Sequence, residues 1–193
     1  IYIKLLKFMP KNVEKMTTNY SPNFNLRKRS IKVIKYIIFH YTGMKSDRSA
    51  ISKLTDFNSK VSCHYYIGKN GNLIQMVPDL YVAWHAGKSY WKKDKLLNDS
   101  SIGIEISNPG HLHGYIAFNK KQIKCLIKIS KKLIKKYRIK KQNILGHSDI
   151  APLRKKDPGE KFPWKFLANK KIGVWHNLNC GRCNKLRGKQ NNV

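Results

Sequence analysis

A run of apolar residues that ends in a histidine constrains the fold of this chain more than any other feature. Residues 33–40 read Val-Ile-Lys-Tyr-Ile-Ile-Phe-His, and all but the lysine and the histidine are β-branched or aromatic. Such a run predicts a strand that is buried on both faces, as in a sheet covered by helices. His40 then lies where the strand ends, a position from which side chains commonly reach a binding site.

The next two segments predict a helix and a β-hairpin. Residues 46–58 place Ala50, Ile51, Leu54 and Phe57 at helical intervals, and Ser46 or Asp47 can cap the first turn. Residues 63–68 and 72–77 then flank an Asn-Gly pair, the strongest short-range signal for a hairpin. We therefore expect antiparallel strands to join the sheet here.

The second half of the chain predicts two more strands and a long helix. Residues 101–107 alternate, so that Ile102, Ile104 and Ile106 face a core while Glu105 points the other way. Residues 119–137 form an apolar stripe that begins with a capping box, and their lysines form a solvated outer face. A short strand, 143–146, then leads to His147, and prolines indicate loop beyond it.

These elements predict an α/β fold with a mixed central sheet of five or six strands and helices on both sides. A length of 193 residues suits one sizeable core. We expect a basic N-terminal arm over residues 1–30, a folded domain over 31–176, and a flexible C-terminal tail over 177–193. We also expect a monomer.

The net charge of +30 suggests a polyanionic partner at first. However, the 33 lysines far outnumber the 7 arginines and are spread over the chain, whereas readers of nucleic acid concentrate arginine at their contacts. We therefore expect no dedicated nucleic-acid partner, only mild attraction to acidic substrates. Binding to DNA or anionic lipid, driven by charge alone, stays open as an alternative.

The compartment is less constrained. No apolar run is long enough to span a bilayer, and residues 1–9 lack the pattern of a signal peptide. We expect a cytoplasmic protein, with export to the periplasm as the alternative. Cys180 and Cys183 form a lone CxxC pair without a second pair of ligands nearby, so they are either free thiols or a redox or disulfide pair.

Three residues offer a ligand set for a catalytic metal. A hydrolytic zinc site takes three protein ligands from His, Asp, Glu or Cys and leaves a fourth position open. His40, His147 and Asp157 supply two imidazoles and a carboxylate from strand ends and a loop. Since the chain has seven histidines, the spacing alone leaves other combinations open.

Several blocks, in this order, resemble the zinc amidase family that includes the bacterial anhydromuramoyl-peptide amidases and the peptidoglycan recognition proteins. Together they cover roughly residues 20 to 176. The blocks are Ile37-Ile38-Phe39-His40-Tyr41-Thr42, Val61-Ser62-Cys63-His64-Tyr65, Ala83-Trp84-His85-Ala86-Gly87, Ser101-Ile102-Gly103-Ile104-Glu105, Gly146-His147-Ser148-Asp149-Ile150-Ala151-Pro152, Lys155-Lys156-Asp157-Pro158-Gly159 and Phe162-Pro163-Trp164.

The resemblance implies that His40, His147 and Asp157 bind Zn²⁺ in a groove at one edge of the sheet. It also implies Glu105 as the acidic catalytic residue and Lys155 as the residue that stabilises the tetrahedral intermediate. The implied reaction is hydrolysis of the amide bond between N-acetylmuramic acid and L-alanine, in peptidoglycan or in muropeptides. The domain over 31–176 would be the catalytic domain.

Each assignment has a plainer alternative. Glu105 could be an exposed strand carboxylate, and Lys155 could belong to a solvated charge run with Arg154 and Lys156. We expect His85, His64 and Trp84 to contact substrate, although each could instead be a structural residue. The whole chain could also be a module that binds muropeptides without cutting them.

Overall fold

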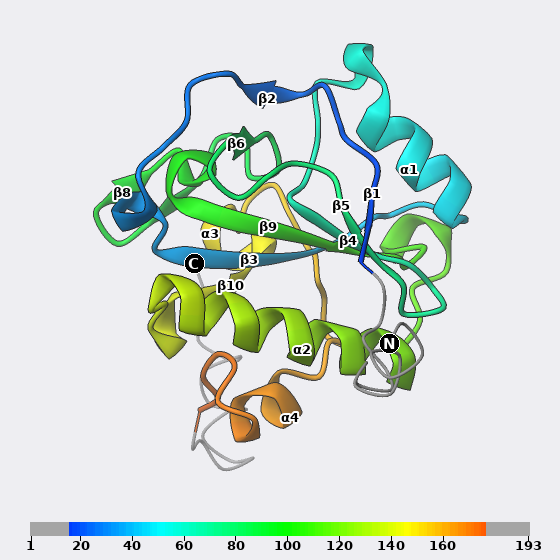
Figure 1. The fold of residues 1–193 in the computed structure, drawn as a ribbon. Helices are drawn as coiled ribbons and strands as arrows, with labels where there is room; N and C mark the ends of the chain where they lie inside the picture. Colours follow the sequence, from blue (N-terminus) through cyan, green and yellow to red (C-terminus); the bar gives the residue numbers. More distant parts are fainter. Residues whose placement is uncertain (1–15, 177–193) are drawn as a thin grey trace, which may run out of the picture.

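The computed structural model describes residues 16–176, and its centre is a six-stranded mixed sheet (Figure 1). Every neighbouring pair is parallel except β4 with β5, which confirms the predicted mixed sheet. In spatial order the strands are β1 (Thr17–Thr18), β5 (Leu73–Gln75), β4 (Tyr65–Ile67), β9 (Ser101–Ile106), β3 (Tyr36–Tyr41) and β10 (Ile144–Gly146).

Strand β3 begins later than the apolar run suggests. The Ser30 hydroxyl accepts a hydrogen bond from the backbone N–H of Lys32 and caps a 3₁₀ turn over Ile31–Val33. Val33 is therefore exposed, and the strand proper extends from Tyr36 to Tyr41. Strand β3 lies between β9 and β10 in the sheet, so it is an inner strand. Its residues are buried from Tyr36 to His40, as expected for a strand that is covered on both faces.

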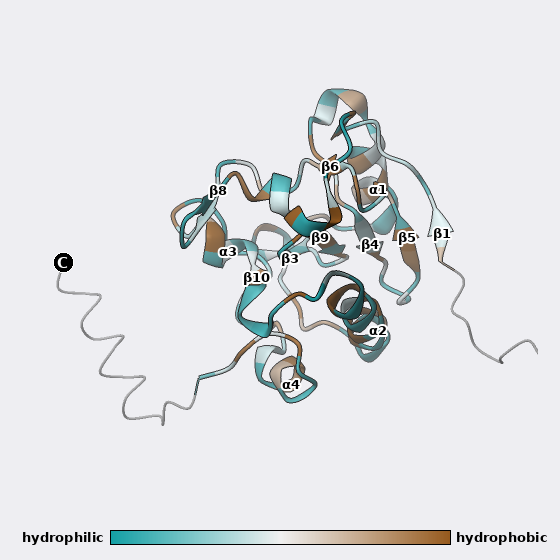
Figure 2. Ribbon diagram, turned by 60° about the vertical axis from the view of Figure 1, so that its left-hand side comes forward, coloured by the Kyte–Doolittle hydropathy of each residue, from teal (hydrophilic) through white to brown (hydrophobic). Residues whose placement is uncertain are grey.

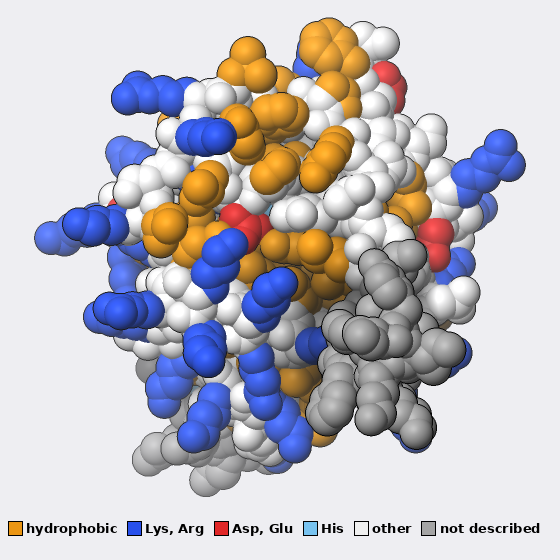
Figure 3. Space-filling view, viewed as in Figure 1, with side chains coloured by type: hydrophobic (Ala, Val, Ile, Leu, Met, Phe, Trp, Pro, Cys, Tyr) orange, Lys and Arg blue, Asp and Glu red, His pale blue; other side chains and the backbone are white. Residues whose placement is uncertain are grey.

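The face of the sheet that carries the larger core is covered by α2 (Lys120–Tyr137). Asn119 and Gln122 form the predicted capping box at its start, and Ile102, Ile104 and Ile106 of β9 are fully buried in the core on this side. Hydrophilic and hydrophobic residues lie on different sides of α2 (Figure 2). Its lysines form the predicted outer face, where basic side chains gather (Figure 3).

Helix α1 (Asp47–Thr55) packs on the opposite face of the sheet and is shorter than predicted. Ser46 caps its start, and Ala50 and Leu54 are buried as expected. The helix ends early because the Asp56 side chain accepts from the backbone N–H of Asn58 and starts a separate 3₁₀ turn. Phe57 was expected on the apolar face, but it is 59% exposed.

The prediction of a continuous loop after β10 is wrong in two places. A short helix, α3 (His147–Ile150), begins directly after β10, and the Asp149 carboxylate accepts from the backbone N–H of Gly146 at 2.7 Å. Helix α4 (Trp164–Asn169) follows Pro163, which is tolerated there because the first turn of a helix needs no N–H donor from that residue. Helix α4 was hidden by the prolines before it, and α3 is too short to show helical periodicity.

The N-terminal residues that the structure describes lie against the domain. Strand β1 adds to the edge of the central sheet, and β2 (Phe24–Asn25) pairs with β6 (Val82–Ala83). The Arg29 guanidinium donates to the backbone carbonyl of Asp79 at 2.9 Å. A further small hairpin joins β7 (Tyr90–Trp91) to β8 (Asp94–Lys95).

Several expectations concern residues outside the described part of the chain: the first half of the N-terminal arm, the C-terminal tail over 177–193, and the pair Cys180 and Cys183. Within residues 16–176, no helix is long and apolar enough to cross a membrane.

Candidate active site and metal centre

The site lies over the carboxyl ends of β3 and β9, on the face opposite α2. Side chains alternate along both strands, so Ile37 and Phe39 enter the core beside α2 while His40 points the other way. On β9, Ile104 likewise enters this core, while Glu105 points to the same face as His40. The site is therefore above two inner strands of the sheet, whereas we had expected a groove at one edge.

His40, His147 and Asp157 converge as predicted, although they are distant in sequence. The Nδ1 atoms of the two histidines are 2.9 Å apart. The Asp157 Oδ2 atom lies 3.0 Å from His40 Nδ1 and 3.1 Å from His147 Nδ1. All three residues are buried, and together they could hold a metal ion. His147 reaches this position because it is the first residue of α3, directly after β10.

The hydrogen bonds around His147 suit a cation at this point. Its Nε2 atom is 3.0 Å from the backbone carbonyl of Ala86, which can only accept, so Nε2 carries a proton. Nδ1, the other ring nitrogen, faces the Asp157 carboxylate, which also only accepts. This buried contact is satisfied either by a proton on Nδ1 or by a metal ion between the two groups.

The local electrostatics favour the protonation states that ligate metals. Burial and the neighbouring His147 lower the pKa of His40 to about 4, so its imidazole is neutral at physiological pH. Burial acts to raise the pKa of Asp157, but the neighbouring His147 and His40 outweigh this and hold the pKa below the ordinary value. Neutral imidazole and ionised carboxylate are the forms that bind divalent cations.

Glu105 stands beside this cluster in an unusual state for a carboxyl group. Burial, together with the charge of Asp157, raises its pKa to about 8, while Lys155 and Lys53 act in the opposite direction. Its Oε2 atom is buried and has no hydrogen-bond partner within the described residues. A carboxyl group with a pKa near neutrality can both accept and donate a proton at physiological pH, as a general acid–base catalyst must.

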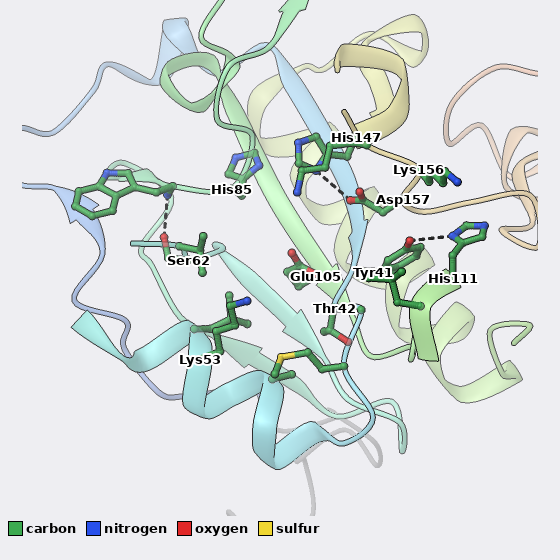
Figure 4. Close-up of a pocket in the computed structure, with 18 of the residues that line it drawn as sticks. Tyr41, Thr42, Lys53, Ser62, His85, Glu105, His111, His147, Lys156 and Asp157 are labelled. Atoms are coloured by element: carbon green, nitrogen blue, oxygen red, sulfur yellow. Dashed lines mark hydrogen bonds and ion pairs between the residues drawn. The ribbon is translucent and has the colours of Figure 1, made fainter. Parts of the chain in front are cut away.

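Except for His40, these groups border one cavity of about 530 Å³ (Figure 4). Glu105, His147 and Asp157 line it, and His40 lies buried beneath them. Of the other predicted residues, Lys155, His85 and Trp84 line the same cavity. Further lining residues include Tyr41, Thr42, Met44, Lys53, Val61, Ser62, His111, Leu112, Arg154 and Lys156.

His64 was expected to contact substrate, but it lies in the core. Its side chain is fully buried, and it is absent from the described residues that line the cavity. Its Nδ1 atom accepts from the backbone N–H of Gly103 at 3.0 Å, and its Nε2 atom lies 2.9 Å from the Arg29 guanidinium. Burial and the Arg29 charge lower its pKa to about 3. His64 therefore stays neutral and joins the N-terminal residues to β9.

The structure also places residues in the cavity that the sequence did not single out. Lys53 projects from α1 toward Glu105 (Figure 4), and it is one lysine among 33, so no local signal marks it. His111 is exposed, yet it borders the cavity, and its Nδ1 atom lies 2.9 Å from the Tyr41 hydroxyl. Its position after a Pro-Gly turn gave no indication of this contact.

Comparison with known proteins places the chain in a family. The family model described as N-acetylmuramoyl-L-alanine amidase matches residues 30–160. The chain belongs to this family. It is similar to the N-acetylmuramoyl-L-alanine amidase AmiD of Escherichia coli K12, with 42% identity over 154 residues, which are 74% of this chain and 55% of that protein.

Other relatives in the amidase family agree with this placement. A 1,6-anhydro-N-acetylmuramyl-L-alanine amidase, AmpD of Haemophilus influenzae, is 30% identical over 170 residues, covering 78% of this chain and 90% of that protein. The solved structure of E. coli AmiD in complex with anhydro-N-acetylmuramic acid-L-Ala-D-gamma-Glu-L-Lys superimposes with a TM-score of 0.70 at 38% identity. That match covers 83% of this chain and 65% of the AmiD chain. The chain thus spans about half the length of AmiD itself.

Proposed function

We propose that this chain is a zinc-dependent amidase that hydrolyses the bond between N-acetylmuramic acid and L-alanine in muropeptides or peptidoglycan. The observation that carries the proposal is the position of Glu105, which borders the same cavity as His147 and Asp157 and has a pKa near neutrality. A muropeptide-binding module would not need a proton-transferring carboxyl group beside a complete set of metal ligands.

Zinc is the metal that best fits the donor set. Two imidazole nitrogens and one carboxylate oxygen, with a further position facing an open cavity, are typical of catalytic zinc sites, whereas calcium and magnesium favour sites built from oxygen ligands. When bound, Zn²⁺ would act as a Lewis acid toward the scissile carbonyl. His40, His147 and Asp157 would hold it.

The protein's own groups supply the remaining chemistry. Glu105 would take a proton from the attacking water and deliver it to the nitrogen of the departing L-alanine. Lys155, which lies close enough to lower the pKa values of both Glu105 and His40, would stabilise the oxyanion of the tetrahedral intermediate. Its influence on both groups, and the exposure of Lys156, favour Lys155 for this role.

The cavity wall suggests where substrate binds. Trp84 is half-buried, and its indole N–H donates to the Asn25 side chain at 2.7 Å, which fixes the ring beside the opening. A fixed aromatic ring suits the apolar face of a sugar or peptide. We therefore retain Trp84 and His85 as candidate substrate contacts, and we take residues 31–176 as the catalytic domain.

Release of the stem peptide tests the proposal. Purified protein is incubated with anhydro-N-acetylmuramyl tripeptide, and the free peptide is quantified by mass spectrometry. We expect release in the presence of zinc, loss of release with excess chelator, and recovery when zinc is restored. His40→Ala should abolish release, whereas His113→Ala, which removes an exposed histidine outside the described cavity lining, should not. Binding of the muropeptide without peptide release in excess zinc would favour a binding module.

The location and assembly of the protein stay predictions. A cytoplasmic monomer is expected, with export as the alternative, and cell fractionation with light scattering of the purified protein would test both.

A further inference from the structure

His85 contacts His40, a proposed metal ligand, on the side of the ring that faces away from Asp157. Its Nδ1 atom lies 3.0 Å from His40 Nε2, the ring nitrogen that faces away from Asp157. On its other side, His85 Nε2 lies 3.1 Å from the Ser101 hydroxyl on β9. The chain of contacts therefore leads from the metal cluster, through two imidazoles, to a buried serine at the start of β9.

The contact between Ser101 and Leu97 sets the direction of every hydrogen bond in this series. The Ser101 hydroxyl is 2.5 Å from the backbone carbonyl of Leu97, and because a carbonyl only accepts, the hydroxyl proton points there. Ser101 must then accept from His85 Nε2–H. Among the described residues, the hydrogen-bond partners of the buried His85 ring are His40 and Ser101, and since neither is a carboxylate that could pair with a charged imidazole, the ring is neutral. Its Nδ1 is thus a bare acceptor.

A bare Nδ1 on His85 determines the tautomer of His40. It can only accept a proton from His40 Nε2–H, so the neutral His40 ring has no proton on Nδ1. The lone pair on His40 Nδ1 points toward His147 Nδ1 and Asp157 Oδ2, where a metal ion would bind. The opposite tautomer would place a proton between the ligands and leave two bare ring nitrogens facing each other at the His85 contact.

The surrounding backbone is built to keep His85 in place. Gly103 leaves room for its ring, because a Cβ atom at that position would lie 2.4 Å from His85 Cγ. The Asn98 side-chain oxygen accepts from the backbone N–H groups of His85 and Ala86, at 3.1 and 2.7 Å. Since the Ala86 carbonyl accepts from His147, this single segment orients both histidine ligands.

We propose that His85 and Ser101 are positioning residues that fix His40 as its Nε2–H tautomer and so present Nδ1 to the metal. The proposal rests on the metal site of the proposed function. It assigns a role to three residues of one face of β9: Ser101 orients His85, Gly103 accommodates it, and Glu105 enters the cavity. Partners of this kind raise metal affinity by orienting the ligand before the metal arrives.

Two readouts on the full chain test the proposal. Zinc affinity is measured by competition with a chromophoric chelator, and the tautomer of His40 is read from long-range ¹⁵N–¹H correlation spectra of the metal-free protein. The variants are Ser101→Ala, His85→Leu and His85→Asn, whose amide oxygen can stand in for Nδ1 and accept from His40. Ser130→Ala is the matched control, because Ser130 is a buried serine on α2 without a hydrogen-bond partner in the described chain.

We expect His40 to be the Nε2–H tautomer in the wild-type protein. Ser101→Ala and His85→Leu should weaken zinc binding about 10–100-fold and mix the two tautomers of His40, while His85→Asn restores most of the affinity. Ser130→Ala should change neither quantity. Thermal unfolding of each variant verifies that it is folded, and the comparison of His85→Asn with His85→Leu separates acceptor chemistry from packing.

Unchanged affinity and an unchanged His40 tautomer in both Ser101→Ala and His85→Leu would overturn the proposal. So would a wild-type protein in which His40 carries its proton on Nδ1. Failure of the proposed function is a separate result: a wild-type protein that binds zinc but releases no stem peptide would contradict the amidase assignment and leave the affinity comparison intact.

Discussion

His40 and Glu105 are directly paired residues on the neighbouring parallel strands β3 and β9. Because they are in register, their side chains leave the sheet on the same face and at the same level. The sheet itself therefore sets the spacing between the proposed metal ligand and the proposed acid–base group, and no flexible loop intervenes. A site on rigid strands holds its geometry better than a site on loops.

Replacing Glu105 by glutamine should remove proton transfer and spare the metal site. The amide keeps the size of the side chain but cannot exchange a proton, so we expect the turnover number to fall about 10²–10⁴-fold. Zinc affinity should change little, because Glu105 lies outside the ligand cluster. Glu160→Gln, an exposed carboxylate on the segment after Asp157, is the matched control. Parental turnover in Glu105→Gln would remove it from the mechanism.

Lys155→Ala should lower the turnover number far more than Lys156→Ala, although the two residues are adjacent. Lys155 influences the pKa of Glu105 and is partly buried, whereas Lys156 is exposed. Losing an oxyanion donor typically lowers turnover about 10²–10³-fold, so we expect a loss of that order for Lys155→Ala and a much smaller one for Lys156→Ala. Steady-state kinetics measures both, with Lys132→Ala on the outer face of α2 as a control for charge. Equal losses of turnover would show that the choice of Lys155 over Lys156 as the oxyanion-stabilising residue is wrong.

The raised pKa of Glu105 predicts a pH-dependent loss of stability in the metal-free protein. The unfolded chain ionises Glu105 near its ordinary pKa of 4.5 and the folded chain near 8, so this contribution is complete below 4.5 and is lost as the pH rises toward 8. Glu105→Gln lacks the effect. Its free energy of unfolding relative to wild type should therefore increase between pH 5 and 8.

The increase should be on the order of 2 kcal/mol, less than the full shift implies because the cavity admits solvent to the carboxyl group. Urea unfolding in excess chelator at both pH values measures it. If wild type and Glu105→Gln show the same pH dependence, the carboxyl group is not held in its neutral form.

Gly103→Ala should destabilise the protein, because the new side chain would crowd His85, which contacts His40. The added methyl group would meet the buried His85 ring, so we expect a loss of about 1–3 kcal/mol in the free energy of unfolding, as in other overpacked cores. The loss should become much smaller in a His85→Ala background, since the colliding ring is absent there. Equal destabilisation in the two backgrounds would mean that Gly103 matters for another reason.

The sequence predicted the parts of the fold that depend on local patterns. The apolar run before His40, the Asn-Gly hairpin and the alternation around Glu105 each correspond to a strand, because burial and turn geometry leave few other choices. Strand β1 was missed because two exposed residues carry no pattern, and only pairing with β5 makes them a strand. Helix α3 was missed because four residues are too few for helical periodicity.

The sequence identified the three candidate ligands that the fold brings together, but it missed the residues that surround them. His40, His147 and Asp157 were identified through motifs. His64, in a similar motif, lies in the core because Arg29 and Gly103 surround it, and these contacts come from distant parts of the chain. Ser101 and Asn98 were not singled out because serine and asparagine are common, and only the direction of their hydrogen bonds gives them a role.

Crystallographic data collected on the zinc-soaked protein, on both sides of the zinc absorption edge, would test the central claim most directly. We expect one anomalous peak within about 2.0–2.2 Å of His40 Nδ1, His147 Nδ1 and an Asp157 carboxylate oxygen, facing the cavity that Glu105 borders. A zinc-saturated crystal with no anomalous peak in reach of these three side chains would contradict the account.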